Sequence, residues 1–175
     1  MLTPDSLNFD SSAAFRVVSI GAFDSGRDGI TTDIKVALFN RDTGLIVSPI
    51  VSFLGTANVG GTAYVSQAVT PFVLGAGHYQ LGAWNYNDTD RNYNDGFSGL
   101  NPISFNSLGG TLTALDAAYS GRAGDLATIF DAGKTRYGAG TLTVDNVPEP
   151  ATWGLMIVGF GVVGALIRRG GAVAA

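Results

Sequence analysis

Clusters of Gly, Asp and Asn recur at short intervals along this chain and limit the folds open to it. They lie within residues 24–29, 40–44, 60–61, 75–77 and 109–110. Asp hydrogen-bonds its own backbone and Gly accepts a positive φ, so such clusters favour turns. The 25 glycines are about twice the usual share, and Glu149 is the only Glu among 14 acidic residues. We therefore expect a body rich in β-structure with little helix.

Between the turns, short windows alternate with the two-residue period of a strand. They cover residues 15–20, 34–39 and 79–84, and predict half-buried strands of five to seven residues. A last strand is expected over residues 140–144, and a short helical turn around residues 125–130. The pattern predicts an all-β fold, an antiparallel β-sandwich or jelly-roll-like body.

Charge and cysteine content exclude several classes of function. Before Pro148, eight Lys and Arg side chains stand against 13 Asp, a net charge of −5, and no basic cluster is present. A surface without clustered positive charge cannot neutralise phosphates, so nucleic acid is not an expected partner. The chain has no Cys, which excludes disulfides, thiolate metal sites and a Cys nucleophile.

The C-terminal segment differs sharply from the body. Residues 151–167 carry no charge, and Arg168 and Arg169 end the apolar run. Seventeen helical residues are just long enough to cross a hydrocarbon core, and Trp153 suits its interface. Basic residues stay on the cytoplasmic side, which places the body outside. We predict one C-terminal transmembrane helix; the alternative is a buried core helix.

The chain thus divides into two parts. Residues 1–146 form the Gly- and Asp-rich body, and residues 147–175 form the tail. Within the tail we expect a linker at 147–150, the helix at 151–167 and a basic stop at 168–169. The two prolines of the linker break any strand or helix that arrives from the body.

The tail resembles the PEP-CTERM protein-sorting signal, in the variant with Trp after the PEP triplet. The residues that carry this resemblance are Pro148, Glu149, Pro150, Trp153, the Gly-Phe-Gly run at 159–161, Arg168 and Arg169. The body segments GAFDSGRDGITTDIKVALFNRDTGLIVS and LGAGHYQLGAW resemble, more loosely, the small β-sandwiches that often precede this tail.

The resemblance implies an exported protein of the cell envelope and an exosortase, a membrane protease, as its partner. Pro148, Glu149 and Pro150 would be the recognition element, and the apolar stretch a temporary anchor in the inner membrane. After processing, the body would reach the cell surface or be secreted.

Residues 1–20 lack the basic region and the apolar run of a signal peptide. Because an outward-facing body needs a leader, we expect the biological start to lie upstream of Met1. The alternative is that the tail itself drives insertion.

Catalytic motifs are sparse in the body. His78 is the only histidine, so a His-based metal cluster is excluded, and no G-x-S-x-G turn is present. We expect His78 to be an ordinary surface or edge residue and the protein not to be an enzyme.

The segment NYNDTDRNYNDG, residues 85–96, is the strongest candidate for a ligand site. Trp84, Tyr86 and Tyr93 offer ring faces on which a sugar could stack beside amides and carboxylates. The oxygen-bearing side chains suit a hard cation such as calcium, without a closing acid. They are Asp88, Asp90, Asn92, Asn94 and Asp95. The simpler interpretation is a long flexible loop.

A second partial calcium pattern comprises Asp24, Asp28 and Gly29, but Gly26 and Lys35 occupy positions where ligands are needed. The simpler interpretation there is a solvated hairpin turn.

Three functions follow, in order of preference. The first is a non-enzymatic surface or extracellular-matrix protein sorted through its tail. The second is a carbohydrate-binding module for exopolysaccharide, acting alone or assisted by calcium, and the third is an enzyme.

Overall fold

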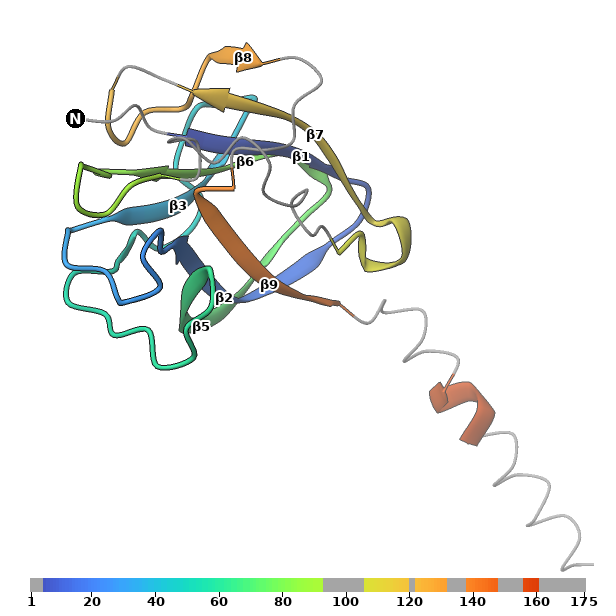
Figure 1. Ribbon diagram of the computed structural model, residues 1–175. Helices are drawn as coiled ribbons and strands as arrows, with labels where there is room; N and C mark the ends of the chain where they lie inside the picture. Colours follow the sequence, from blue (N-terminus) through green and yellow to red (C-terminus); the bar gives the residue numbers. More distant parts are fainter. Residues whose placement is uncertain (1–4, 93–105, 120–121, 132–137, 148–155, 161–175) are drawn as a thin grey trace, which may run out of the picture.

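The computed structural model is an antiparallel β-sandwich of two unequal sheets (Figure 1). It describes residues 5–92, 106–119, 122–131, 138–147 and 156–160. The all-β, two-sheet architecture expected from the sequence is confirmed.

The larger sheet has six strands in the order β4-β3-β6-β1-β7-β8. The smaller sheet has the order β5-β2-β9, and a 3-10 turn, Leu108–Gly110, precedes β7. The strands are β1 (Asp5–Ser11), β2 (Phe15–Phe23), β3 (Lys35–Asn40), β4 (Val51–Ser52), β5 (Tyr64–Leu74), β6 (Gly77–Trp84), β7 (Leu112–Tyr119), β8 (Ile129–Asp131) and β9 (Gly140–Asn146).

The core lies between the two sheets and is mainly aliphatic and aromatic. Alternate residues of β2, among them Phe15 and Val17, are fully buried against the inner faces of β1, β3 and β6. Phe9, Phe15 and Tyr79 form a three-ring cluster with centroids 5.6–6.0 Å apart. Such burial is the main source of stability in a chain without disulfides.

The larger sheet departs from the expected half-buried pattern. Its strands β3 and β6 are buried on both faces. On the outer face Ala37, Phe39 and Trp84 form a second apolar cluster, packed against Ile46 and Leu126. Segments beside the sheet cover this face, and period-two alternation cannot report such cover.

One further expectation needs correction. Residues 125–130 form no helical turn; residue 125 lies in a bend, and the chain then runs without regular structure into β8, which pairs with β7. His78 is a surface residue, as one of the two expected alternatives had it: its side chain is 54% exposed, and its strand β6 is central, between β3 and β1. The expected strand at 140–144 is observed as β9, two residues longer.

The predicted transmembrane segment 151–167 falls mostly outside the described residues. Residues 156–160 are helical and exposed. Among the helical residues that the structure describes, none forms a segment of membrane-spanning length and hydrophobicity.

Candidate functional site

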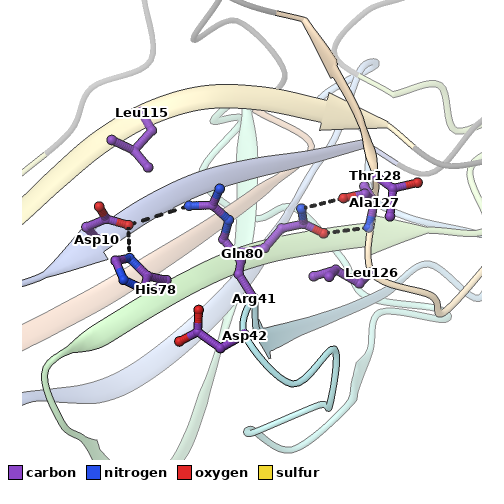
Figure 2. A pocket seen from close by; sticks show the side chains of 9 residues that line it. All are labelled: Asp10, Arg41, Asp42, His78, Gln80, Leu115, Leu126, Ala127 and Thr128. Atoms are coloured by element: carbon purple, nitrogen blue, oxygen red, sulfur yellow. Dashed lines mark hydrogen bonds and ion pairs between the residues drawn. The ribbon is translucent and has the colours of Figure 1, made fainter.

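A cavity of about 480 Å³ opens on the outer face of the larger sheet (Figure 2). Strands β1, β6 and β7, the turn after β3 and the segment before β8 supply its walls. We call it the outer-face pocket. Its lining residues are Asp10, Arg41, Asp42, His78, Gln80, Leu115, Leu126, Ala127 and Thr128.

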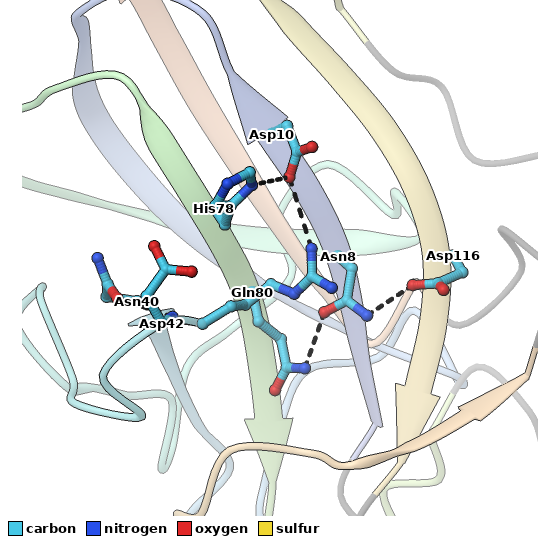
Figure 3. Close-up of polar contacts among 8 residues, drawn as sticks. Asn8, Asp10, Asn40, Asp42, His78, Gln80 and Asp116 are labelled. Atoms are coloured by element: carbon cyan, nitrogen blue, oxygen red, sulfur yellow. Dashed lines mark hydrogen bonds and ion pairs between the residues drawn. The ribbon is translucent and has the colours of Figure 1, made fainter.

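The floor of the pocket is a buried amide network (Figure 3). Gln80 is 1% exposed, and its Nε2 donates to Asn8 Oδ1 at 2.8 Å and to the Ala127 carbonyl at 3.0 Å. Its Oε1 accepts from the Ala127 amide at 2.7 Å. Asn8 in turn donates to Asp116 Oδ1 at 2.6 Å. These bonds occupy the floor amides, so they shape the pocket and are not open to a ligand.

The rim of the pocket carries its charges. Asp10 Oδ1 lies 2.8 Å from His78 Nδ1 and 3.5 Å from Arg41 Nη1. The His78 ring and the Arg41 guanidinium are both directed toward the same carboxylate oxygen (Figure 2). Asp42 stands in the same turn as Arg41, and Leu115 and Leu126 add apolar surface to the lining from opposite sides of the pocket (Figure 2). The rim thus combines both signs of charge with a hydrocarbon surface.

Asp10 holds the pKa of His78 above its ordinary value. The hydrogen bond to Asp10 is the largest cause, followed by the negative charges of Asp10 and Asp42; slight burial and Arg41 oppose them. The imidazolium is favoured because the neighbouring carboxylates stabilise its charge. This is an exposed ion pair, so it contributes little to folding.

An Asp–His pair also occurs in hydrolytic triads, where the ring activates a hydroxyl. Within the described ranges, no Ser or Thr hydroxyl is hydrogen-bonded to His78, and the pocket's own hydroxyl is that of Thr128. The pair therefore has an orienting carboxylate and no positioned nucleophile.

The rings proposed to stack on a sugar are inside the protein. Trp84 is 6% exposed and packs against Phe39, with ring centroids 6.1 Å apart. Tyr86 is 1% exposed, and burial raises the pKa of its phenol well above the ordinary value. Its hydroxyl accepts from the Phe23 amide at 3.2 Å and donates to the Ala139 carbonyl. The sugar-binding assignment of these two residues is corrected: both are core residues. Tyr93 lies outside the described residues.

The proposed calcium ligands are not gathered around one point. Asp90 accepts four hydrogen bonds from the backbone and hydroxyls of Thr31 and Thr32, all through Oδ2. Asn92 donates to Asp5, and the backbone carbonyl of Asp88 accepts from Arg91 Nε. In the part of the chain that the structure describes, no group of three acidic or His side chains could hold a metal ion. Asn94 and Asp95 lie outside it.

The Asp24 turn is also closed to a metal. Asp24 is 2% exposed, while residues 26–28 of the same turn are exposed. Its carboxylate accepts from the amides of Arg27 and Gly29 at 2.8 and 2.9 Å, and from Asn58 Nδ2 at 2.9 Å. The oxygens that could bind calcium instead organise the loop.

The outer-face pocket was not found from the sequence. Asp10, Asp42 and His78 are far apart in the chain, and the pairing of β1 with β6 brings Asp10 opposite His78. The sequence offers little indication of this pocket. Arg41 and Asp42 lie in the polar turn cluster at 40–44, and a hairpin turn without any ligand site would have the same composition.

The tail begins directly behind the last strand of the smaller sheet. Strand β9 ends at Asn146, which pairs with Phe15, and Pro148 follows two residues later. Residues 146–169 match the family model of the PEP-CTERM protein-sorting motif. The chain carries a PEP-CTERM sorting signal.

The PEP-CTERM motif implies an exported protein that an exosortase processes, and a place in the cell envelope or at the surface. The matched residues include the six expected from the sequence, namely Pro148, Glu149, Pro150, Trp153, Arg168 and Arg169. All six lie outside the described residues, so their assignment rests on the motif.

The body in front of the motif has no recognised relative in these comparisons. No curated protein and no solved structure matches the chain. The PEP-CTERM match covers the tail alone, so it carries no information on what the sandwich binds.

Proposed function

We propose that this chain is a non-enzymatic surface or extracellular-matrix protein, sorted through its PEP-CTERM tail and released or retained outside the cell as a β-sandwich. The observation that carries the proposal is the motif at residues 146–169, joined without a further domain to β9. The tail acts as an address and a temporary inner-membrane anchor. The sandwich is the mature part.

The absence of an enzyme's machinery at the described pocket supports the non-enzymatic part of the proposal. The Asp10–His78 pair stands at an exposed rim, while efficient nucleophilic catalysis needs a hydroxyl or thiol within hydrogen-bond reach of the ring. The floor amides are engaged with one another, with the backbone of Ala127 and with the Asp116 carboxylate.

Mass spectrometry of both chain ends, in the membrane and released fractions of the native cells, tests the sorting. We expect released protein to end close to Pro148–Pro150 and to lack the apolar segment. Replacement of Pro148, Glu149 and Pro150 by Ala should keep the full tail and leave the protein in the membrane. The matched control is Pro49→Ala, an exposed proline of the body that should not alter release. A full tail through Arg169 in every fraction of the unmodified protein contradicts the proposal.

A second candidate, exopolysaccharide binding, is favoured by the outer-face pocket and no longer by the 84–96 loop. The charged rim of Arg41 and Asp42 offers donors and acceptors to hydroxyls, and Leu115 and Leu126 offer an apolar surface to a sugar's C–H groups. Retention on exopolysaccharide from the producing cells, compared between the unmodified protein and an Arg41→Ala, Asp42→Ala variant, tests it. Equal retention contradicts this candidate.

A further inference from the structure

The end of the sandwich from which the tail departs is built from a few turns that meet there. Ser11 at the end of β1 pairs with Gly77 and Leu112, the first residues of β6 and β7. Phe15 at the start of β2 pairs with Leu74 and Asn146, the ends of β5 and β9. The β1–β2 turn, the β5–β6 turn, the segment before β7 and the exit of β9 therefore share one end of the molecule (Figure 1).

This end carries no charged side chain on those segments, which are Ser12–Ala14, Gly75–Ala76, Ser107–Thr111 and Asn146–Val147. Most of these residues are exposed. The nearest charges are the Arg16–Asp145 pair and the cluster of Asp10, His78 and Arg41. The exposed Asp42 also lies close, in the turn after β3, because Asn40 pairs with Tyr79 near the start of β6. We call the uncharged segments the tail-proximal end.

The opposite end is markedly different. It holds Asp5, where β1 begins, together with the loops that follow β2, β6 and β7. Those loops contain nine charged residues, which are Asp24, Arg27, Asp28, Asp33, Asp88, Asp90, Arg91, Arg122 and Asp125.

The sorting element is too close to the sandwich for an enzyme to reach it without touching this end. One residue, Val147, separates Asn146 from Pro148, so the two are about 7 Å apart at most, at about 3.3 Å per residue. Strand β9 is held in place near its end, because Asp145 pairs with Arg16 at 2.9 Å and Thr143 bonds Ser19 at 2.8 Å. Any protease that encloses the triplet in a cleft must therefore lie against the neighbouring turns.

We propose that the tail-proximal end is the surface on which the exosortase docks when it processes the tail. The inference rests on the proposed sorting function. It means that the exosortase recognises a surface of the body in addition to the Pro-Glu-Pro triplet. A membrane-embedded enzyme presents a surface near the apolar region of the bilayer, and uncharged, small side chains can approach it without the cost of desolvating charge.

Charge placed on this end tests the proposal. Ala13 and Ala76 are exposed in the β1–β2 and β5–β6 turns, so Ala13→Asp with Ala76→Asp adds charge without disturbing the core. We expect tail release, followed by pulse–chase of the full-length and shortened chains, to slow by about 10-fold or more, because two unpaired charges are placed at a desolvated interface. The matched control is Val59→Asp, at a residue that is 97% exposed in the loop leading to the opposite end. It should be processed at the native rate.

A spacer variant distinguishes lost docking from misfolding as the cause of slow release in the doubly substituted protein. Nine Gly and Ser residues inserted between Val147 and Pro148 move the triplet away from the body, and should restore release in the doubly substituted protein. Release of that protein at the native rate without a spacer overturns the inference. Slow release that the spacer does not restore also overturns it, because the added charge then acts elsewhere.

Lysine variants distinguish the enzyme from the lipid surface. Ala13→Lys with Ala76→Lys should slow release as the Asp pair does if the end docks on an uncharged protein surface. If the Lys pair instead leaves release unchanged or faster, the end faces anionic headgroups and the exosortase assignment is overturned. If the unmodified protein never loses its tail, the proposed sorting function is wrong. If the unmodified protein and the charged variants all lose the tail at the same rate, only the docking surface is wrong.

Discussion

Gln80 and Ala127 form a two-bond clasp between the centre of the larger sheet and the segment that leads into β8. Gln80 Oε1 accepts from the Ala127 amide at 2.7 Å, and Gln80 Nε2 donates to the Ala127 carbonyl at 3.0 Å. This mimics a strand pairing with a side chain. It fixes the segment that contains Leu126, Ala127 and Thr128, which line one side of the outer-face pocket.

Replacement of Gln80 by Leu should lower the free energy of unfolding by about 2–4 kcal/mol, because it leaves the Ala127 amide and carbonyl and the Asn8 amide oxygen buried without their partner. Urea unfolding followed by circular dichroism measures the change. Gln67→Leu is the matched control, since Gln67 bonds to Ser52 and Thr56 at the surface and should cost under about 1 kcal/mol. Equal losses in the two variants contradict the clasp's role.

The titration of His78 depends on Asp10. Asp10→Asn should lower the His78 pKa toward its ordinary value of 6.5, because it removes the anionic acceptor that favours the imidazolium. A raised folded-state pKa contributes stability below pH 6.5, and that contribution disappears as the pH rises through the folded-state pKa. Since the chain has one His, its ring Cε1–H signal can be followed directly by NMR. Asp88→Asn, in the loop after β6 at the opposite end, should leave that titration unchanged.

Acid should weaken the contact between Asp90 and the loop at Thr31–Thr32. Burial tends to raise the Asp90 pKa, but the hydrogen bonds from Thr32 and Thr31 outweigh it and hold the pKa below 3.8. A lowered folded-state pKa contributes stability above pH 3.8, which is lost as the pH falls through the folded-state pKa.

Asp90→Asn should therefore cost about 1–3 kcal/mol near neutral pH and flatten the decline of stability below pH 4. Guanidinium unfolding at several pH values measures both effects. Asp88→Asn is the control, because the Asp88 side chain is exposed in the same loop. If the free energy of unfolding of Asp90→Asn declines below pH 4 as steeply as that of the unmodified protein, other carboxylates govern the acid dependence.

The ring of Phe39 lies across Gly82 on the neighbouring strand. A Cβ at Gly82 would stand 2.9 Å from Phe39 Cε2, closer than real Cβ contacts, and the ring is held by Trp84 and Ala37. Gly82→Ala should cost about 1–3 kcal/mol of stability from overpacking. Gly75→Ala, where a Cβ meets nothing within 4 Å, is the comparison and should be near neutral. Thermal unfolding measures the stability of the two variants. Equal stability would contradict close packing of Phe39 against Gly82 on the outer face.

Much of the fold could be predicted from local pattern. The windows at 15–20, 34–39 and 79–84 lie in or overlap β2, β3 and β6, because period-two apolar side chains match a strand that faces a core. The expected helical turn at 125–130 was wrong, because a side chain 47 residues away in sequence supplies the hydrogen bonds there. No local window contains that partner.

The candidate ligand site could not be predicted in the same way. Trp84 and Tyr86 stand beside a polar loop in the sequence, which suggests exposed rings, yet both belong to buried clusters. Burial depends on which segments fold over a residue, and Phe39 and Ala139, which cover these rings, lie far away in the chain.

By itself, the sequence determined the all-β class and the PEP-CTERM tail, because turn chemistry, strand period and a contiguous sorting motif are local properties. The tertiary structure decided which residues meet. It placed Asp10 beside His78, buried Trp84, and brought three uncharged turns to the end where β9 leaves the sandwich. Antiparallel pairing joins residues that are distant in the chain, and the hydrophobic effect rewards burial without regard to sequence separation.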